Sequence, residues 1–173
     1  MDVKTAFLQG NLEEDLYMRQ PDGYVSDEFP DHVCKLKKSI YGLKQSARCW
    51  NNAIDTFLKS NGYKQMQSDP CLYMKSIKDQ NGIIKFITLS IHVDDMLPFS
   101  NDLSTLNDEK KPIASKFKID DMGEMKHVLG MLIKTDRTGG KMTISQSKYL
   151  EGVLKRYGTV QTCVDPFGTR KTL

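Results

Sequence analysis

The sequence lacks the features of disulfide-rich, zinc-binding and membrane-spanning proteins. Its four cysteines form no C-x-x-C pair, and no histidine stands at zinc-ligand spacing from any of them. No apolar run approaches the ~20 residues that a membrane-spanning helix needs. The first residues contain neither the basic nor the apolar region of a signal peptide. We therefore expect an intracellular protein, cytoplasmic or nuclear, that is not secreted and binds no membrane.

Strong net charge and internal repeats are absent as well. The chain has 173 residues, a net charge of +3 and 39% hydrophobic residues, which fits one ordinary globular domain. Basic residues gather in one stretch, namely at Lys35, Lys37, Lys38, Lys44 and Arg48. Such a stretch is more often a solvated face than a phosphate-binding surface, so charge alone does not indicate a nucleic-acid partner.

The periodicity of apolar residues predicts alternating strands and helices. Residues 46–61 carry apolar side chains at i, i+3, i+4 and i+7, the pattern of an amphipathic helix that Gly62 ends. Asn81-Gly82 separates the apolar runs 71–75 and 83–93 and predicts a hairpin. A second helix should start at Asn101 or Asp102 and be kinked or split at Pro112.

Shorter elements complete the prediction. The sequence favours strands at 1–3, 16–18, 33–36, 96–99, 126–133 and 142–144, a short turn or helical piece at 5–8 and a final helix at 147–157. This mixture predicts an α+β fold.

The pair Asp94-Asp95 is the first candidate for chemistry. It follows a strongly apolar strand, where two like charges repel each other and lose hydration. A solvent-exposed turn resolves this conflict, and an isolated Asp-Asp pair is more often such a turn. A bound Mg²⁺ resolves it differently, because Mg²⁺ takes carboxylate oxygens and substrate phosphates together.

A third carboxylate strengthens the metal interpretation. Asp2 lies at the end of a predicted strand and is followed five residues later by Phe7. Asp2 meets Asp94 only if their two strands are neighbours in one sheet. In that case three carboxylates surround a place for two metal ions, the arrangement used for in-line phosphoryl transfer.

Seven sequence blocks occur in the order found in copia-type retrotransposon reverse transcriptases. They are DVKTAFLQG, YMRQPDGY, VCKLKKSIYGLKQSARCW, DPCLY, HVDDML, FKIDDMGEMKHVLGMLI and ISQSKYLEGVLKRYG. Together they cover nearly the whole chain, which resembles the palm region and the start of the thumb of these enzymes. The resemblance implies an antiparallel ferredoxin-like palm sheet with helices on one face. It also implies RNA-directed DNA polymerisation with a primed RNA or DNA template and deoxynucleotide triphosphates as partners, along with other regions of the Pol polyprotein.

The resemblance assigns the carboxylates to catalysis. Asp2, Asp94 and Asp95 match the aspartates that hold two Mg²⁺ ions, with Mn²⁺ as an alternative metal. The carbonyl of Val3 matches a further metal contact near the nucleotide. The alternative for Asp94 and Asp95 is the solvent-exposed turn described above, which has no role in metal binding.

The resemblance also assigns residues to the nucleotide and to the primer and template. Phe7 matches the aromatic residue that excludes the 2′-hydroxyl of a ribonucleotide. We therefore expect its ring to face the nucleotide sugar instead of the core. The alternative is that Phe7 is a core residue, which is more common for an aromatic side chain beside a strand. Tyr41 and Gly42 match the turn that lines the incoming nucleotide, and Gly42 alternatively serves only a turn with positive φ. The candidates for primer and template contacts are His92, Lys44, Arg48, Leu129 and Gly130.

The chain departs from the family pattern at several positions. His92 stands where the family has Tyr, and Ala47 stands where it has Pro. Asp120 replaces a Lys, which removes a positive charge expected near the leaving pyrophosphate, and Lys118 or Lys126 are candidates to replace it. One residue precedes Asp2, so we expect the fingers to be missing and the fragment to be weak or inactive alone.

We expect the palm at residues 1–135, a primer-grip-adjacent strand and the start of the thumb helix at 136–158, and a loose tail at 159–173. Two functional alternatives remain. One is a polymerase completed by fingers from another chain, and the other is a non-catalytic nucleic-acid-binding remnant.

Overall fold

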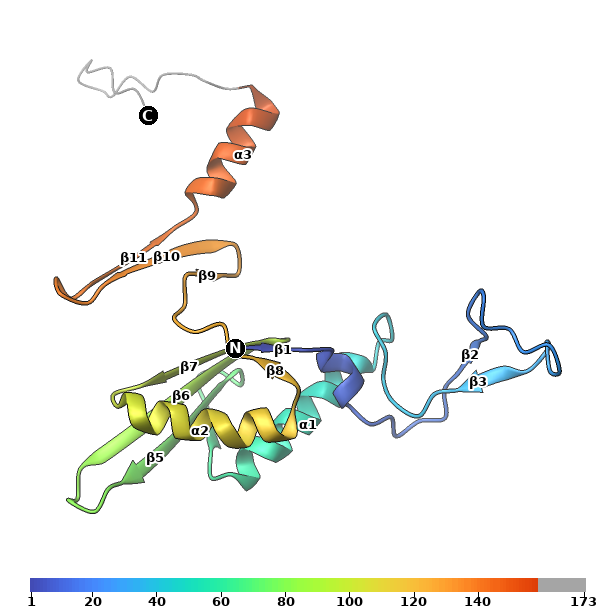
Figure 1. The fold of residues 1–173 in the computed structure, drawn as a ribbon, viewed down its shortest axis with the longest axis horizontal. Helices are drawn as coiled ribbons and strands as arrows, with labels where there is room; N and C mark the ends of the chain where they lie inside the picture. Colours follow the sequence, from blue (N-terminus) through green and yellow to red (C-terminus); the bar gives the residue numbers. More distant parts are fainter. Residues whose placement is uncertain (159–173) are drawn as a thin grey trace. The chain divides into compact units, whose positions relative to one another are not determined.

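The computed structural model describes residues 1–158, and the chain divides into two compact units (Figure 1). The first unit comprises Met1–Met122, and the second begins at Gly123. This division lies earlier in the chain than residue 135, the expected end of the palm, and the functional border at 135 stays a prediction. The expected loose tail at 159–173 lies outside the described residues.

A six-stranded antiparallel sheet forms the framework of the first unit. Its strands lie in the order β4-β5-β6-β7-β1-β8. They are β4 (Lys64–Gln65), β5 (Leu72–Lys78), β6 (Ile84–His92), β7 (Asp95–Ser100), β1 (Asp2–Val3) and β8 (Ile119–Asp120). Because β1 lies between β7 and β8, the first residues of the chain meet residues from its middle.

The long strands bury one face of this sheet. Along β6, Ile87 and Leu89 are buried, whereas Ile84 and Phe86 are exposed on the opposite face. This alternation follows from the two-residue period of a strand. The predicted hairpin of β5 and β6 is confirmed, and Gly82 in its loop has a φ of 81°.

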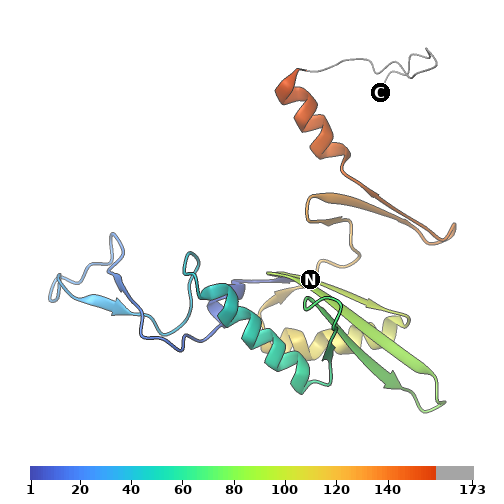
Figure 2. The same ribbon diagram turned by 180° about the vertical axis from the view of Figure 1, so that it is seen from behind.

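Helix α1 (Ser46–Ser60) confirms the predicted amphipathic helix (Figure 2). Trp50, Ile54 and Leu58 recur every fourth residue and are all almost fully buried. They join the buried residues of the sheet in one apolar cluster.

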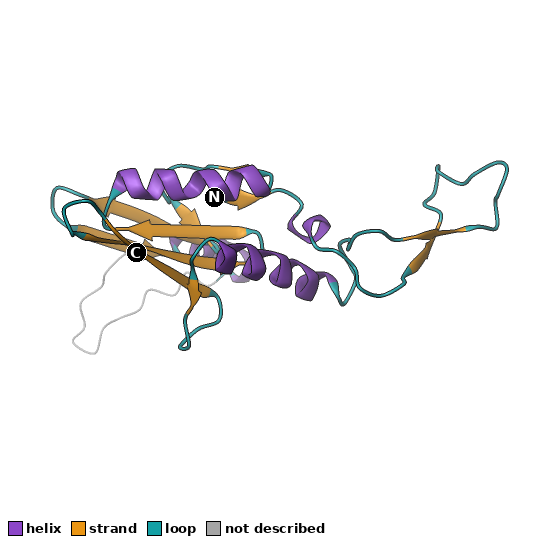
Figure 3. Ribbon diagram, turned by 90° about the horizontal axis from the view of Figure 1, so that it is seen from below, coloured by secondary structure: helices purple, strands orange, loops and turns teal. Residues whose placement is uncertain are grey.

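Helix α2 (Leu103–Lys116) runs beside β6 and β7 (Figure 3). Pro112 was expected to kink or split this helix; the split is wrong, because α2 continues through Pro112, and the kink stays a prediction. A proline inside a helix removes one backbone hydrogen bond, and burial of the following Ile113 offsets that cost. Phe117, just after the helix, packs edge-on against Trp50 and Phe57 with ring centroids 5.3 and 5.2 Å apart, which joins α2 to α1.

Asp102 caps α2, as predicted. Its carboxylate accepts a hydrogen bond from the Thr105 N–H at 2.7 Å and lies 3.2 Å from the Lys85 ammonium. The bonds from the Thr105 hydroxyl and N–H, followed by Lys85, lower the pKa of Asp102 from 3.8 to about 2. A carboxyl whose pKa is depressed by folding stabilises the fold above its unfolded pKa and loses that contribution as the pH falls.

We expect Asp102→Asn to weaken the dependence of stability on pH between about 4 and 2. Asparagine still accepts the capping bond, but it has no charge to lose on acidification. The measurement is the urea midpoint of both proteins at pH 7 and pH 3. The expected result is a smaller shift of the midpoint in the variant, and equal shifts in the two proteins would contradict it.

A short 3-10 helix, η1 (Ala6–Gln9), follows β1. Beyond it, β2 (Tyr17–Arg19) and β3 (Val33–Lys35) pair as a separate two-stranded sheet. An isolated antiparallel bridge between Asn11 and Lys38 closes the base of the segment that carries β2 and β3.

The second unit contains a three-stranded antiparallel sheet and one helix among its described residues. The strands β9 (His127–Val128), β10 (Met131–Asp136) and β11 (Lys141–Ser145) lie in the order β11-β10-β9. The single strand predicted at 126–133 is wrong, because the chain turns between β9 and β10. Helix α3 (Ser147–Tyr157) confirms the predicted final helix, but none of its residues is buried.

Together these elements confirm an α+β fold with antiparallel sheets.

Candidate active site

One row of the central sheet gathers acidic residues from three strands. Asp2 on β1 is in register with Asp95 on β7 and with Asp120 on β8. On the other side of β7, His92 of β6 is in register with Asp95. Residues directly opposite in an antiparallel sheet share a face and have Cβ atoms ~4.5–5.5 Å apart. The sheet therefore presents His92, Asp95, Asp2 and Asp120 side by side, and this set is called the acidic row below.

Asp94 lies beside the acidic row, in the tight turn from β6 to β7. Val93, the other residue of this turn, has a φ of 55°. A β-branched residue is rarely found there, and such strain costs ~1–3 kcal/mol. The turn is held by two hydrogen bonds that come from other elements. The Val3 N–H donates to the Asp94 carbonyl at 2.9 Å, and the Trp50 indole donates to the Val93 carbonyl at 2.6 Å.

Asp120 pairs with a cation from the neighbouring strand segment. The Lys4 ammonium lies 2.8 Å from its carboxylate, and both side chains are half-exposed. Lys4 thus neutralises the charge of Asp120, and the role expected of Lys118 or Lys126 near the pyrophosphate stays a prediction. An exposed pair of this kind adds little stability, so its main effect is on the local charge.

Phe7 and Tyr41 meet next to the sheet. Their rings are in edge contact with centroids 4.9 Å apart. Phe7 is half-buried and packs against the apolar core, and the expectation that it faces the nucleotide sugar stays a prediction. Tyr41 is exposed, and Gly42 has a φ of 93°, as the third residue of a type II turn requires.

Two buried serines hold the loop that carries Tyr41. The Ser39 hydroxyl donates to the carbonyls of Phe7 and Gly10, and the Ser46 hydroxyl donates to the Ile40 carbonyl. Ser39 and Ser46 are the two buried polar residues among the described residues, and each is almost completely inaccessible. Sequence analysis missed both residues, because a serine beside a glycine turn carries no signal of burial.

The remaining sequence-predicted residues lie on other elements. Lys44 and Arg48 are exposed, and Arg48 pairs with Glu14. Leu129 and Gly130 belong to the second unit, where they form the turn between β9 and β10 with φ of 47° and 78°.

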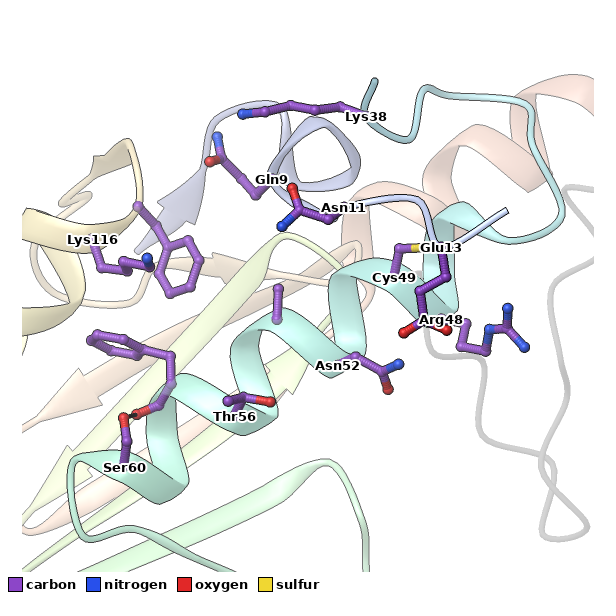
Figure 4. A pocket seen from close by; sticks show the side chains of 13 residues that line it. Gln9, Asn11, Glu13, Lys38, Arg48, Cys49, Asn52, Thr56, Ser60 and Lys116 are labelled. Carbon is purple, nitrogen blue, oxygen red and sulfur yellow. Dashed lines mark hydrogen bonds between the residues drawn. The ribbon is translucent and has the colours of Figure 1, made fainter. Parts of the chain in front are cut away.

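A pocket of about 590 Å³ lies along α1 (Figure 4). Phe57 and Phe117 form part of its wall, and Lys38, Lys116 and Arg48 also line it. None of Asp2, Asp94 and Asp95 belongs to its lining, so the pocket is distinct from the acidic row.

The chain matches the family model described as "Reverse transcriptase (RNA-dependent DNA polymerase)" over residues 1–167. It is 44% identical over 157 residues to a retrovirus-related Pol polyprotein from transposon TNT 1-94 of Nicotiana tabacum. The aligned region is 91% of this chain and 12% of that relative. The chain belongs to the copia-type reverse transcriptases.

Further relatives of this reverse transcriptase chain come from a plant and a yeast. It is 35% identical to the Pol polyprotein from transposon RE1 of Arabidopsis thaliana, over 90% of the chain and 10% of that relative. It is 31% identical to a putative transposon Ty5-1 protein of Saccharomyces cerevisiae, over 87% of the chain and 47% of that relative. The chain thus spans about a tenth of the length of the Pol polyproteins and about half of the Ty5-1 protein. No solved structure matches it.

The carboxylates of this reverse transcriptase chain have the donor chemistry that Mg²⁺ requires. Asp2, Asp94 and Asp95 are all half-buried, and β1 and β7 are adjacent. In the side-chain conformations of residues 1–158, no three Asp, Glu, His or Cys side chains lie close enough to one another to hold a metal ion. Binding therefore requires the carboxylates to turn toward one another.

No helix within residues 1–158 has the length and apolar character needed to cross a membrane.

Proposed function

We propose that this chain is the nucleotidyl-transfer domain of an RNA-directed DNA polymerase. The observation that carries the proposal is the register of Asp2 with Asp95, next to Asp94, in a chain of the reverse transcriptase family. Two carboxylate-bearing segments that are distant in the sequence meet on β1 and β7, which are adjacent inner strands of the six-stranded sheet. Such a meeting is what a two-metal site for in-line displacement needs.

In this proposal Asp2, Asp94 and Asp95 hold two Mg²⁺ ions, or Mn²⁺ in their place, and the Val3 carbonyl contributes a further oxygen. When bound, the ions supply Lewis-acid stabilisation of the charge that develops on the transferring phosphoryl group. The sheet contributes positioning, because the backbone bonds between β1 and β7 fix the spacing of the carboxylates. Ion binding in this proposal rotates the three side chains and keeps the backbone pairing of β1 with β7.

The nucleotide side of the proposed site consists of Phe7, Tyr41 and Gly42. The edge contact between the two rings forms a wall beside the proposed nucleotide position. The apolar core packed behind Phe7 restricts movement of its ring away from that position. A wall at that place excludes the 2′-hydroxyl of a ribonucleotide by steric contact. This role makes deoxynucleotide triphosphates the substrates.

A primed RNA or DNA template is the proposed partner. His92 lies at one end of the acidic row and contacts the primer end, while Lys44 and Arg48 offer positive charge to template phosphates. Leu129 and Gly130 act as the primer grip. Residues 1–135 then form the palm, and 136–158 form the adjoining strand and the start of the thumb. Other regions of the Pol polyprotein are further partners.

We further propose that the chain is a weak polymerase by itself. Asp120 places an additional negative charge in the acidic row, and Lys4 is occupied in neutralising it. His92 replaces the phenol that the family has beside the primer end. Phosphoryl transfer depends chiefly on positioning and on stabilising the charge of the triphosphate, so both departures lower the rate.

We expect Asp94→Asn to lower primer extension on an RNA template by at least about 100-fold, because metal ions contribute several kcal/mol to the transition state. The variant should also lose Mn²⁺ binding, measured as free Mn²⁺ by electron paramagnetic resonance. Asp79→Asn is a matched control, because Asp79 lies in the β5–β6 loop at the far end of the sheet strands.

The outcomes separate the candidate functions. Weak extension and Mn²⁺ binding that both disappear in Asp94→Asn but persist in Asp79→Asn support the proposal. Binding of primer–template that falls with salt, with no Mn²⁺ binding and no extension, identifies a nucleic-acid-binding remnant instead. Extension that becomes strong only on addition of a second Pol chain identifies a polymerase completed by fingers from that chain.

A further inference from the structure

The turn that carries Asp94 is strained, and strain of this kind persists only where surrounding contacts impose it. Val93 adopts a φ of 55°, which its branched side chain disfavours. Val93 is also 45% exposed, so burial of its own side chain does not hold it in this conformation. The contacts that hold the turn must therefore involve its backbone.

Trp50 makes such a contact from a different element. Its indole nitrogen Nε1 donates a short hydrogen bond of 2.6 Å to the Val93 carbonyl oxygen. The indole is 3% exposed and packs edge-on against Phe117, which in turn packs against Phe57. The donor is thus fixed by helix α1 and by the end of α2, and it is not free to follow the turn.

We propose that Trp50 is a positioning residue that holds the Val93–Asp94 turn in place through this hydrogen bond. The inference rests on the proposed function, in which Asp94 and Asp95 bind the metal ions. Trp50 touches neither substrate nor metal; it fixes the backbone between β6 and β7 and thereby the direction of both carboxylates. Of the apolar side chains large enough to fill this part of the core, only tryptophan also carries an N–H donor.

The first test uses Trp50→Phe, which keeps an aromatic ring against Phe117 but removes the donor. Amide hydrogen exchange is measured at Val3 and Met96, whose N–H groups bond to Asp94 and Met1 across β1 and β7. We expect exchange at these two amides to rise about 5- to 10-fold more than at the Leu89 amide in the middle of β6, because one net hydrogen bond is lost locally.

The matched control is Phe57→Leu. Phe57 packs on the same Phe117 ring but lies two helical turns after Trp50 on α1, and its side chain has no N–H to donate to the turn. Loss of its packing should accelerate all sheet amides by a similar factor. If Trp50→Phe produces the same uniform pattern as Phe57→Leu, Trp50 is an ordinary core residue and the inference is overturned.

A double-mutant cycle tests the link to the strain itself. Glycine tolerates a positive φ, so Val93→Gly removes the backbone strain against which Trp50 is inferred to hold the turn. In the Val93→Gly background, Trp50→Phe should change the exchange at Val3 and Met96 by less than half of its effect in the parent chain. Equal effects in both backgrounds would overturn the inference.

Mn²⁺ binding connects the turn to the proposed function. Trp50→Phe should weaken Mn²⁺ binding about 5- to 10-fold, as measured by the resonance signal of free Mn²⁺. Unchanged binding in the variant overturns the positioning role. Absence of binding in the parent chain contradicts the proposed function instead, and the exchange measurements then still decide whether Trp50 holds the turn.

Discussion

Replacing Gly10 with alanine is expected to lower the free energy of unfolding of the first unit by about 2–3 kcal/mol. Gly10 has a φ of −79°, so an alanine would meet no backbone strain there. A Cβ atom at this position would nevertheless lie 2.7 Å from the carbonyl carbon and the Cβ of Cys49, and 2.9 Å from the Trp50 nitrogen. These are atoms of the backbone and of a buried residue in α1, so η1 and the helix have to separate.

Gly152→Ala is the matched control for this substitution. Gly152 lies within α3, and a Cβ there meets no atom within 4 Å. The measurement is urea unfolding followed by circular dichroism, which reports on both units, and by the fluorescence of Trp50, the chain's single tryptophan, which reports on the first unit. A Gly10→Ala protein with the midpoint of the parent chain would show that η1 adjusts without cost. Because η1 carries Phe7, a shift of η1 would also move the wall proposed for the nucleotide sugar.

Leu89→Ala should be still more disruptive, with an expected loss of about 3–4 kcal/mol. Leu89 is completely buried in the middle of β6 and belongs to the cluster formed with α1 and α2. Alanine leaves a cavity that the paired backbones of β5 and β7 prevent from closing. Urea unfolding with circular dichroism measures the loss.

Ile84→Ala in the same strand is the comparison for Leu89→Ala. Ile84 is 63% exposed on the other face of the sheet, and its substitution should stay within about 0.5 kcal/mol. Similar losses in the two variants would contradict the assignment of the core to the face that α1 and α2 cover.

The elements with strong apolar periodicity could be predicted from the sequence. Helix α1 and the β5–β6 hairpin belong to this group, because local patterning and tertiary packing favour the same structure in both. Pro112 and the turn at Leu129–Gly130 show the opposite case. In α2 the neighbouring burial outweighs the proline, and between β9 and β10 a leucine with positive φ interrupts an apolar run that resembles one strand.

The candidate site was predictable as a set of residues but not as a geometry. Ordered family motifs pointed to Asp2 and to the pair 94–95, and their meeting depended on two strands being neighbours, which β1 and β7 are. Their catalytic role stays a prediction. The pairing of Lys4 with Asp120 and the bond from Trp50 to the turn were not predictable, because both depend on contacts between segments that are distant in sequence.

The order of the six strands has a consequence for how the protein behaves at high concentration. Its two outermost strands, β4 and β8, are only two residues long, so each offers few unpaired backbone groups to a strand from another molecule. Beyond β4, the uncovered part of β5 carries Lys75, which pairs with Glu109, and the exposed Lys78, whose charge repels an identical strand. The sheet thereby carries its own protection against edge-to-edge aggregation, although its outer face exposes several large apolar side chains.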